Sequence, residues 1–484
     1  MRTGTGIAAA LTLTATIWLA SSTPAQAQAQ NARIRDQIHG FLADLFFQDT
    51  HKLKIGPIEV GPARQGQHPV SINGISAHLG QDAQDEDALR LALPQFALTA
   101  QPLGSDRLRL THVSMPDGLS ILTAQGKRVG TLNAAGAKAV GTWAADLGSA
   151  IDVDIIMDQL RFAFDGRELP DNILVFAHAE KAVLKSEDSF DANGLWTSNG
   201  TGRLTGIDLG TDQDGRLTLG ELAVSTLVGG LRPDTLLQLE YLLTDPDALD
   251  NSDWVDTILK DGLLDGLTLE TSLKDMAISA AGSPGTVRLA RLAQGLTLAD
   301  LRSDAGAVGL VLAMEGLSVP PDMLPDADSG RFLPSTVSLD MTLQGLPGRT
   351  LGERAAGLKA EGNSQMFELE AMRILTAAPI RLALNALRLD AAGMSITATG
   401  GFDAAPDSTM GFTGKVDVLA RGLTEAMGEL ATLPPSEFKQ NALTALAVFL
   451  GNAEPQRDGT MRALFEFDRM GAVTVNGRPL DLPK

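Results

Sequence analysis

Apolar and polar residues alternate along strand-like segments of this chain, and the alternation skips once in each segment. In IRLALNALRL (residues 380–389), apolar side chains fall at positions 380, 382 and 384 and then at 387 and 389. Residues two apart in a β-strand share a face, so a spacing of three would turn the rest of the strand over. A β-bulge adds one residue and restores the original face. The pattern therefore predicts a strand with one apolar face and a bulge near Asn385 and Ala386.

The same skip recurs along the chain. A helix would gather three of the five apolar residues and turn Leu382 and Leu389 to its other side, whereas a bulged strand gathers all five. Some matches would also arise by chance in a chain this rich in Leu and Ala. The copies begin at uneven intervals, which argues against a solenoid of fixed period. Further copies are Leu91, Leu93, Phe96 and Leu98; Leu108, Leu110, Val113 and Met115; Ile155, Met157, Leu160 and Phe162; Leu217, Leu219, Leu222 and Val224; Thr271, Leu273, Met276 and Ile278; and the six in-phase positions between Val308 and Val319.

Helical periodicity is confined to a few segments. Residues 31–48 place Ile34, Ile38 and Leu42 on one stripe of a helix. Residues 249–264, 423–433 and 436–450 also predict helices. A sheet with one apolar face must bury that face against other elements, such as helices. We therefore expect a β-rich α+β fold, with long, bent antiparallel sheets whose dry face is partly covered by a few helices.

The chain opens with features of a secretory signal peptide. Arg2 precedes an apolar stretch, and Ala25, Gln26 and Ala27 form an A-x-A cleavage site. We expect cleavage after Ala27 and export to the periplasm, with an uncleaved anchor as the alternative. Residues 28–344 are then an N-terminal β-rich region, residues 345–363 a linker rich in Gly, and residues 364–484 a C-terminal α+β module.

Composition narrows the classes of partner. The chain has no cysteine, which excludes disulfides and thiol catalysis. Its net charge of −20 disfavours nucleic acid and anionic lipid head groups as partners. Beyond the first thirty residues there is no long apolar run, so we expect no integral membrane span.

One segment resembles a calcium-binding loop. In GTDQDGRLTLGE (residues 210–221), Asp212, Asp214 and Glu221 match the third, fifth and twelfth positions of an EF-hand loop. Gly210 occupies the first position, where a ligand belongs. The alternative is a β-hairpin with Asp214-Gly215 in its turn, and the strand-like flanks favour it.

The remaining polar residues form no recognisable catalytic set. All six histidines lie before residue 180, and none has the spacing of a metal-binding motif. A zinc site built by the fold from His51, His68 and His78 is the one alternative. Acidic clusters elsewhere are typical of solvated turns and helix caps. The sequence therefore predicts no enzyme activity and no cofactor.

The order of elements after residue 363 resembles a known family. FELEAMRI and IRLALNALRL are followed by the pair MSITATGGFDAAPDSTMGFTGKVDVLA, two helices and a closing hairpin, GTMRALFEFDRMGAVTVNGRPLDL. This order resembles the C-terminal part of the exported proteobacterial proteins grouped as domain of unknown function 2125, and more distantly AsmA-type envelope proteins. Residues 89–110 and 333–347 are similar to the same group, but its early Gly-Phe-Pro segment is absent. The resemblance implies export and a β-rich fold, and it supplies no catalytic residue.

These observations favour two functions. The first is an exported, non-enzymatic envelope protein that binds an apolar or amphipathic ligand, such as a lipid, on the dry face of its sheet. The alternative is a structural or protein-interaction component of the cell envelope whose acidic surface meets a basic partner. A hydrolase using loop acids comes third, because no nucleophile and base can be paired from the sequence.

Overall fold

The computed structural model describes most of the chain between residues 24 and 480. The described ranges are 24–45, 53–79, 89–114, 118–123, 125–164, 174–211, 215–231, 265–280, 282, 285–324, 330, 332–360, 363, 366–391 and 393–480. The chain divides into two compact units, which are described separately: residues 1–133 with 137–154, and residues 134–136 with 155–484.

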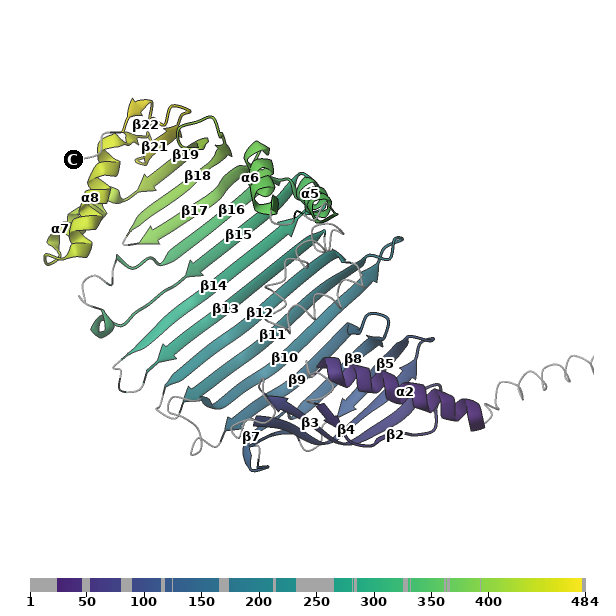
Figure 1. The fold of residues 1–484 in the computed structure, drawn as a ribbon. Helices are drawn as coiled ribbons and strands as arrows, with labels where there is room; N and C mark the ends of the chain where they lie inside the picture. Colours follow the sequence, from purple (N-terminus) through teal and green to yellow (C-terminus); the bar gives the residue numbers. More distant parts are fainter. Residues whose placement is uncertain are drawn as a thin grey trace, which may run out of the picture. The chain divides into compact units, whose positions relative to one another are not determined.

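The first unit is an antiparallel sheet covered by one helix. Helix α2 (Pro24–Leu45) buries Ile34, Ile38 and Leu42 against the apolar side of the strands, and Figure 1 shows it lying across them. Its polar side chains also bond to the sheet, because Arg35 Nε donates to the Ile58 carbonyl at 3.1 Å. The strands are β1 (Leu53–Ile55), β2 (Ile58–Val60), β3 (His68–Leu79), β4 (Leu89–Pro102), β5 (Arg107–Ser114), β6 (Leu119–Leu122), β7 (Arg128–Asn133) and β8 (Gly136–Ala144).

The second unit is built on a long antiparallel meander. Each strand from β10 to β19 pairs with the next one along the chain, and β19 then pairs with β21 (Figure 1). Strand β9 (Ser149–Phe164) carries the chain from the first unit into the second. The other strands are β10 (Leu174–Phe190), β11 (Trp196–Thr211), β12 (Arg216–Leu231), β13 (Gly266–Ser279), β14 (Thr286–Ala299), β15 (Gly306–Glu315), β16 (Thr336–Leu346), β17 (Arg381–Ala391), β18 (Met394–Ala404), β19 (Phe412–Arg421), β20 (Glu454–Pro455), β21 (Met461–Phe467), β22 (Val473–Val475) and β23 (Arg478–Pro479). The β-rich α+β fold expected from the sequence is confirmed.

The predicted bulge lies in β17. On the β16 side the register shifts between Asp340 and Met341, and on the β18 side the pairing skips Asn385 and Ala386. The amide of Asn385 donates to Asp340 Oδ1 at 2.8 Å and to Thr342 Oγ1 at 2.9 Å, which holds the extra residue in place. The strand leucines of IRLALNALRL therefore lie opposite four alternating apolar residues of β16. The pairs are Leu382–Leu343, Leu384–Met341, Leu387–Leu339 and Leu389–Val337.

The skips in β11, β12 and β13 are compensated differently, because these neighbouring strands each carry an extra residue in the same row. Thr205 pairs with Glu221 and Ile207 with Leu219, so the register is the same on both sides of the interruption. The apolar residues before and after the skips pack in one cluster. Its members are Ala179, Ile207 and Leu219, with Leu160, Leu204, Leu209, Leu217, Leu222, Leu273 and Met276 against them.

Left-handed backbone marks this row of skips on alternate strands. Gln159 (φ 52°), Gly206 (φ 60°), Asp275 (φ 52°) and Gly316 (φ 69°) come from β9, β11, β13 and the end of β15. Gly206 must also be small, since a Cβ there would lie 2.4 Å from Glu180 Cγ. The interruptions of neighbouring strands are therefore aligned in one row across the sheet, and they are not independent bulges of single strands.

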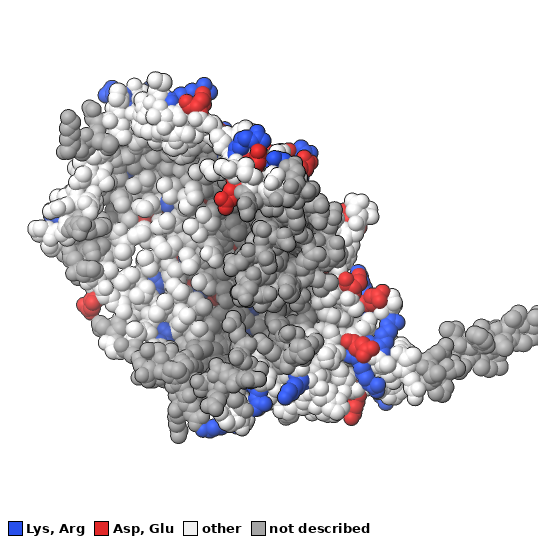
Figure 2. Space-filling view, viewed as in Figure 1, with Lys and Arg blue, Asp and Glu red and all other residues white. Residues whose placement is uncertain are grey.

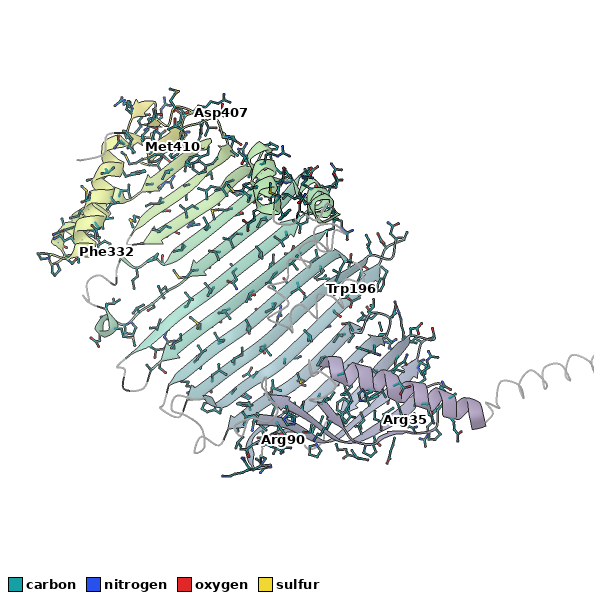
Figure 3. The ribbon with its side chains drawn as sticks, in the orientation of Figure 1. Arg35, Arg90, Trp196, Phe332, Asp407 and Met410 are labelled. Atoms are coloured by element: carbon teal, nitrogen blue, oxygen red, sulfur yellow. The ribbon has the colours of Figure 1, made fainter. Side chains whose placement is uncertain are left out.

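Three of the four predicted helices are confirmed. They are α2, α7 (Leu423–Thr432) and α8 (Glu437–Asn452), while residues 249–264 lie outside the described residues. The side chain of Ser436 caps α8 by accepting from the Lys439 amide at 3.1 Å. Phe332, labelled near this helix pair in Figure 3, packs in one apolar cluster with residues of α7 and α8. A short 3-10 helix, η3 (Pro321–Met323), lies between β15 and β16.

The segment expected to be a linker contains a helix. Residues 345–363 include α5 (Gly348–Ala360), which buries Ala355 and Leu358, and FELEAMRI begins α6 (Phe367–Ala377). Both helices belong to the second unit, and the division between the two units falls at residues 154–155. The subdivision at 345–363 stays a prediction.

Deleting Asn385 should be tolerated, whereas deleting Ala383 should destabilise the protein. Without Asn385 the apolar residues of β17 alternate regularly, so Leu387 and Leu389 stay on their face and only two exposed hydrogen bonds are lost, at about 1 kcal/mol or less. Deleting Ala383 from the regular part of the strand puts Leu382 out of phase with the leucines that follow, at a cost of about 3 kcal/mol or more. Urea unfolding of both variants measures the difference. Equal midpoints for the two variants would contradict the role of Asn385 as the extra residue.

Candidate ligand-binding face

One face of the second unit's sheet carries apolar residues in continuous cross-strand rows, and we call it the apolar face. In a pleated sheet, directly opposite residues share a face, so a chain of pairs traces a row across it. One row is Leu204, Leu222, Leu273, Leu292, Met314, Val337, Leu389, Ile396, Ala420 and Met461. A parallel row is Thr226, Leu269, Leu296, Leu310, Met341, Leu384, Gly400, Val416 and Phe465.

Among the described residues, helices α7 and α8 cover one end of the apolar face. Ala398, Ala420 and Ala463 on β18, β19 and β21 are buried, and α7 contacts β18 while α8 contacts β21. Farther along the sheet, five leucines remain between 37% and 50% exposed, and we call this part the open section. Its members are Leu184, Leu269, Leu292, Leu312 and Leu382. In Figure 2, the sheet surface turned to the viewer shows few charged groups among the described residues.

The opposite face is polar and held by ion pairs. Lys274 Nζ lies 2.7 Å from Glu221 Oε1, and Arg291 Nη1 lies 3.2 Å from Glu315 Oε1. These pairs are solvent-exposed, so each contributes little to stability. They give this face its charged character, in contrast to the apolar face of the same strands.

A hollow of about 640 Å³ lies on this polar face. Small side chains such as Ala223, Ser225 and Ala293 are among its lining residues, which also include Arg203 and Arg291. Arg203 is already paired with Glu221 and Arg291 with Glu315. The hollow therefore offers no uncommitted charge from these two arginines.

Only one of the three calcium candidates, Glu221, lies among the described residues. Asp212 and Asp214 lie outside the described residues, while Glu221 lies within β12 and bonds to Lys274. The hydrogen bond from Lys274 lowers the pKa of Glu221, burial opposes this shift, and the charge of Arg203 adds to the lowering. The flanking elements are strands β11 and β12, as the hairpin interpretation expects.

Two of the described histidines, His68 and His178, lie within hydrogen-bond distance of protein groups. His68 is buried with Nδ1 3.2 Å from the Gly61 carbonyl oxygen, and His178 Nε2 lies 3.2 Å from Gln159 Oε1. His51 lies outside the described residues. Within the described ranges, no group of three or more His, Asp or Glu side chains has the geometry of a metal site.

The sequence patterns missed part of the open section. Leu184 follows no run of alternating residues, and its position emerges only from its pairing with Gly202. Leu292 continues Val287 and Leu289 with the same skip, but Gln294 interrupts the fourth position. Allowing one polar residue in the pattern would have found Leu292.

Comparisons with known proteins add no assignment. No family model, curated protein or solved structure matches the chain. Among the helices that the structure describes, none is long and apolar enough to cross a bilayer. The apolar face is thus the feature on which a function can be argued.

Removing the partner of Glu221 should raise its pKa. Lys274→Met takes away the hydrogen bond that stabilises the carboxylate, so the pKa of Glu221 should rise towards its ordinary value of 4.5. A carboxylate whose pKa is lowered in the folded protein stabilises the fold at pH values above its ordinary pKa, and this contribution is lost as the pH falls through the lowered pKa. The free energy of unfolding of Lys274→Met should therefore rise less between acidic and neutral pH than that of the unmodified protein. Carboxyl NMR titration measures the shift. Arg203→Met should give a smaller rise, and an unchanged Glu221 in Lys274→Met would refute the pairing.

Proposed function

We propose that this is an exported, non-enzymatic envelope protein that holds the acyl chain of an amphipathic lipid on the open section. The observation that supports it is the exposure of five leucines on one face of a sheet whose other face is charged. Exposed apolar side chains gathered on one face of a sheet favour a binding site in water-facing proteins. The alternative, a structural or protein-interaction component of the envelope, would instead meet a basic partner through the acidic surface of the chain.

The dimensions of the open section suit an elongated ligand. It runs from Leu184 on β10 to Leu382 on β17. Neighbouring strands lie about 4.8 Å apart, so seven intervals span roughly 34 Å. This is comparable to the hydrocarbon thickness of a bilayer, about 30 Å. A ligand lying across the strands would therefore have room for a full acyl chain.

The chemistry of the open section favours recognition by area and not by specific polar contacts. Its five defining residues are all leucines, which offer no hydrogen bonds. Hydrophobic burial is non-directional and scales with the area removed from water. The protein should therefore accept acyl chains of several lengths. The resemblance to domain of unknown function 2125 agrees with this proposal without defining a ligand.

Export follows from the first 27 residues in this proposal. Helix α2 begins at Pro24, so cleavage after Ala27 would remove only its first turn. The buried residues Ile34, Ile38 and Leu42 lie downstream and would stay in the mature chain. Mass spectrometry of the periplasmic protein should find Gln28 at its N-terminus. A retained residue 1 in that fraction would favour the uncleaved anchor.

Two adjacent residues of β15 give a matched test of the lipid proposal. Leu312 is 40% exposed on the apolar face, and Val311 is 45% exposed on the polar face. Leu312→Asp should weaken binding of a monomeric fluorescent fatty acid by about tenfold or more, because the bound chain would desolvate an unpaired carboxylate. Val311→Asp should bind as the unmodified protein does. Fluorescence titration of both variants decides the matter, and equal affinities would exclude the open section as the site.

A further inference from the structure

Helix α6 exposes an apolar stripe next to the open section. Met366, Leu369 and Met372 are 47%, 64% and 68% exposed. They follow one another at intervals of three, which places them along one side of the helix. The helix turns Ile374 inward, where it is buried. The three exposed side chains, which we call the α6 stripe, therefore form a separate apolar projection.

The α6 stripe is joined to the apolar face by a short, anchored connection. Only residues 378–380 separate α6 from β17, which carries Leu382 of the open section. The Ala378 amide donates to the Ile374 carbonyl, and the Ala404 amide donates to the Ile380 carbonyl at 2.8 Å. Figure 1 shows α6 beside α5 at one end of these strands. The stripe is thus held near one end of the proposed acyl-binding surface.

The ion pairs beside the α6 stripe combine both signs of charge, although the chain as a whole is strongly acidic. Arg373 Nε lies 2.9 Å from Glu370 Oε2, and Arg354 of α5 lies 3.8 Å from the other oxygen of the same carboxylate. Two guanidinium groups thus surround one carboxylate, with Glu368 nearby in the first turn. This arrangement suits zwitterionic lipid head groups better than anionic ones.

The exposed area argues against a second protein molecule as the occupant. A full Leu or Met side chain offers on the order of 100 Å² of apolar surface, so the three partly exposed side chains offer roughly 200 Å². A stable protein interface buries about 800 Å² on each partner. Shallow insertion into a bilayer has no such threshold, since each apolar side chain that enters the interface adds its own burial.

We propose that the α6 stripe docks the protein on a zwitterionic lipid bilayer and so places the open section where it can receive an acyl chain. This inference rests on the proposed function and names where the lipid is acquired. It predicts two separable activities: contact with a bilayer through α6, and retention of a lipid chain on the sheet.

The test uses vesicle flotation with the full chain and phosphatidylcholine vesicles in 0.15 M salt. The double variant Leu369→Ser, Met372→Ser should reduce the floating fraction by about tenfold. Both positions are largely exposed, so the fold should be retained, as circular dichroism can verify. Met470→Ser is the matched control, because Met470 is 82% exposed in the turn before β22 and should float as the unmodified protein does.

A second measurement separates this inference from the proposed function. Monomeric fluorescent fatty acid, supplied without vesicles, should bind the α6 double variant as tightly as the unmodified protein. If the double variant floats normally, or the unmodified protein does not float, bilayer docking through α6 is refuted while fatty-acid binding can still stand. If Leu312→Asp binds fatty acid normally, the acyl-binding proposal fails whatever the vesicles show. Analytical sedimentation could also show that the unmodified protein is a dimer and the double variant a monomer. In that case the α6 stripe would bind a second copy of the chain, and the bilayer inference would be overturned.

Discussion

A long strand keeps an apolar face only if every extra residue along it is compensated. Side chains alternate with a period of two, so a single uncompensated insertion transfers the remaining leucines to the wrong side. In this protein the correction takes two forms. Asn385 is a local bulge against uninterrupted β16, whereas the row through Gly206 and Asp275 interrupts neighbouring strands together. The apolar face, and the ligand argument built on it, depend on both.

The strands could be predicted because their phase is a local property of the sequence. The ten residues from 380 were enough to place the bulge at Asn385. The alignment of skips across neighbouring strands could not be predicted, since it depends on which strands pair and in which register. Helix α5 was missed for another reason. Gly348, Gly352 and Gly357 are typical of a loop, but burial of Ala355 and Leu358 outweighs their weak helix propensity.

The candidate site was predicted in kind but not in extent. The sequence indicated a dry sheet face, and the rows of paired leucines now define it. Its exposure could not be read from the chain, because cover depends on where helices pack. Helices α7 and α8 cover the end near β18 and β21, while Leu184 and Leu312 remain accessible. The acidic motif at 210–221 could not be interpreted from its spacing alone. The spacing suggested a calcium ligand at Glu221, but pairing of β12 with β13 places Lys274 within hydrogen-bond distance of this carboxylate.

The row of left-handed residues constrains how this sheet can change over time. Since the register matches on either side of the row, gaining or losing one residue in a single strand near Gly206 would set it out of step with both neighbours. A complete hairpin, by contrast, carries both halves of the interruption with it. The sheet can therefore gain or lose whole hairpins far more readily than single residues. Relatives of this protein should differ in strand number while keeping the row of left-handed residues.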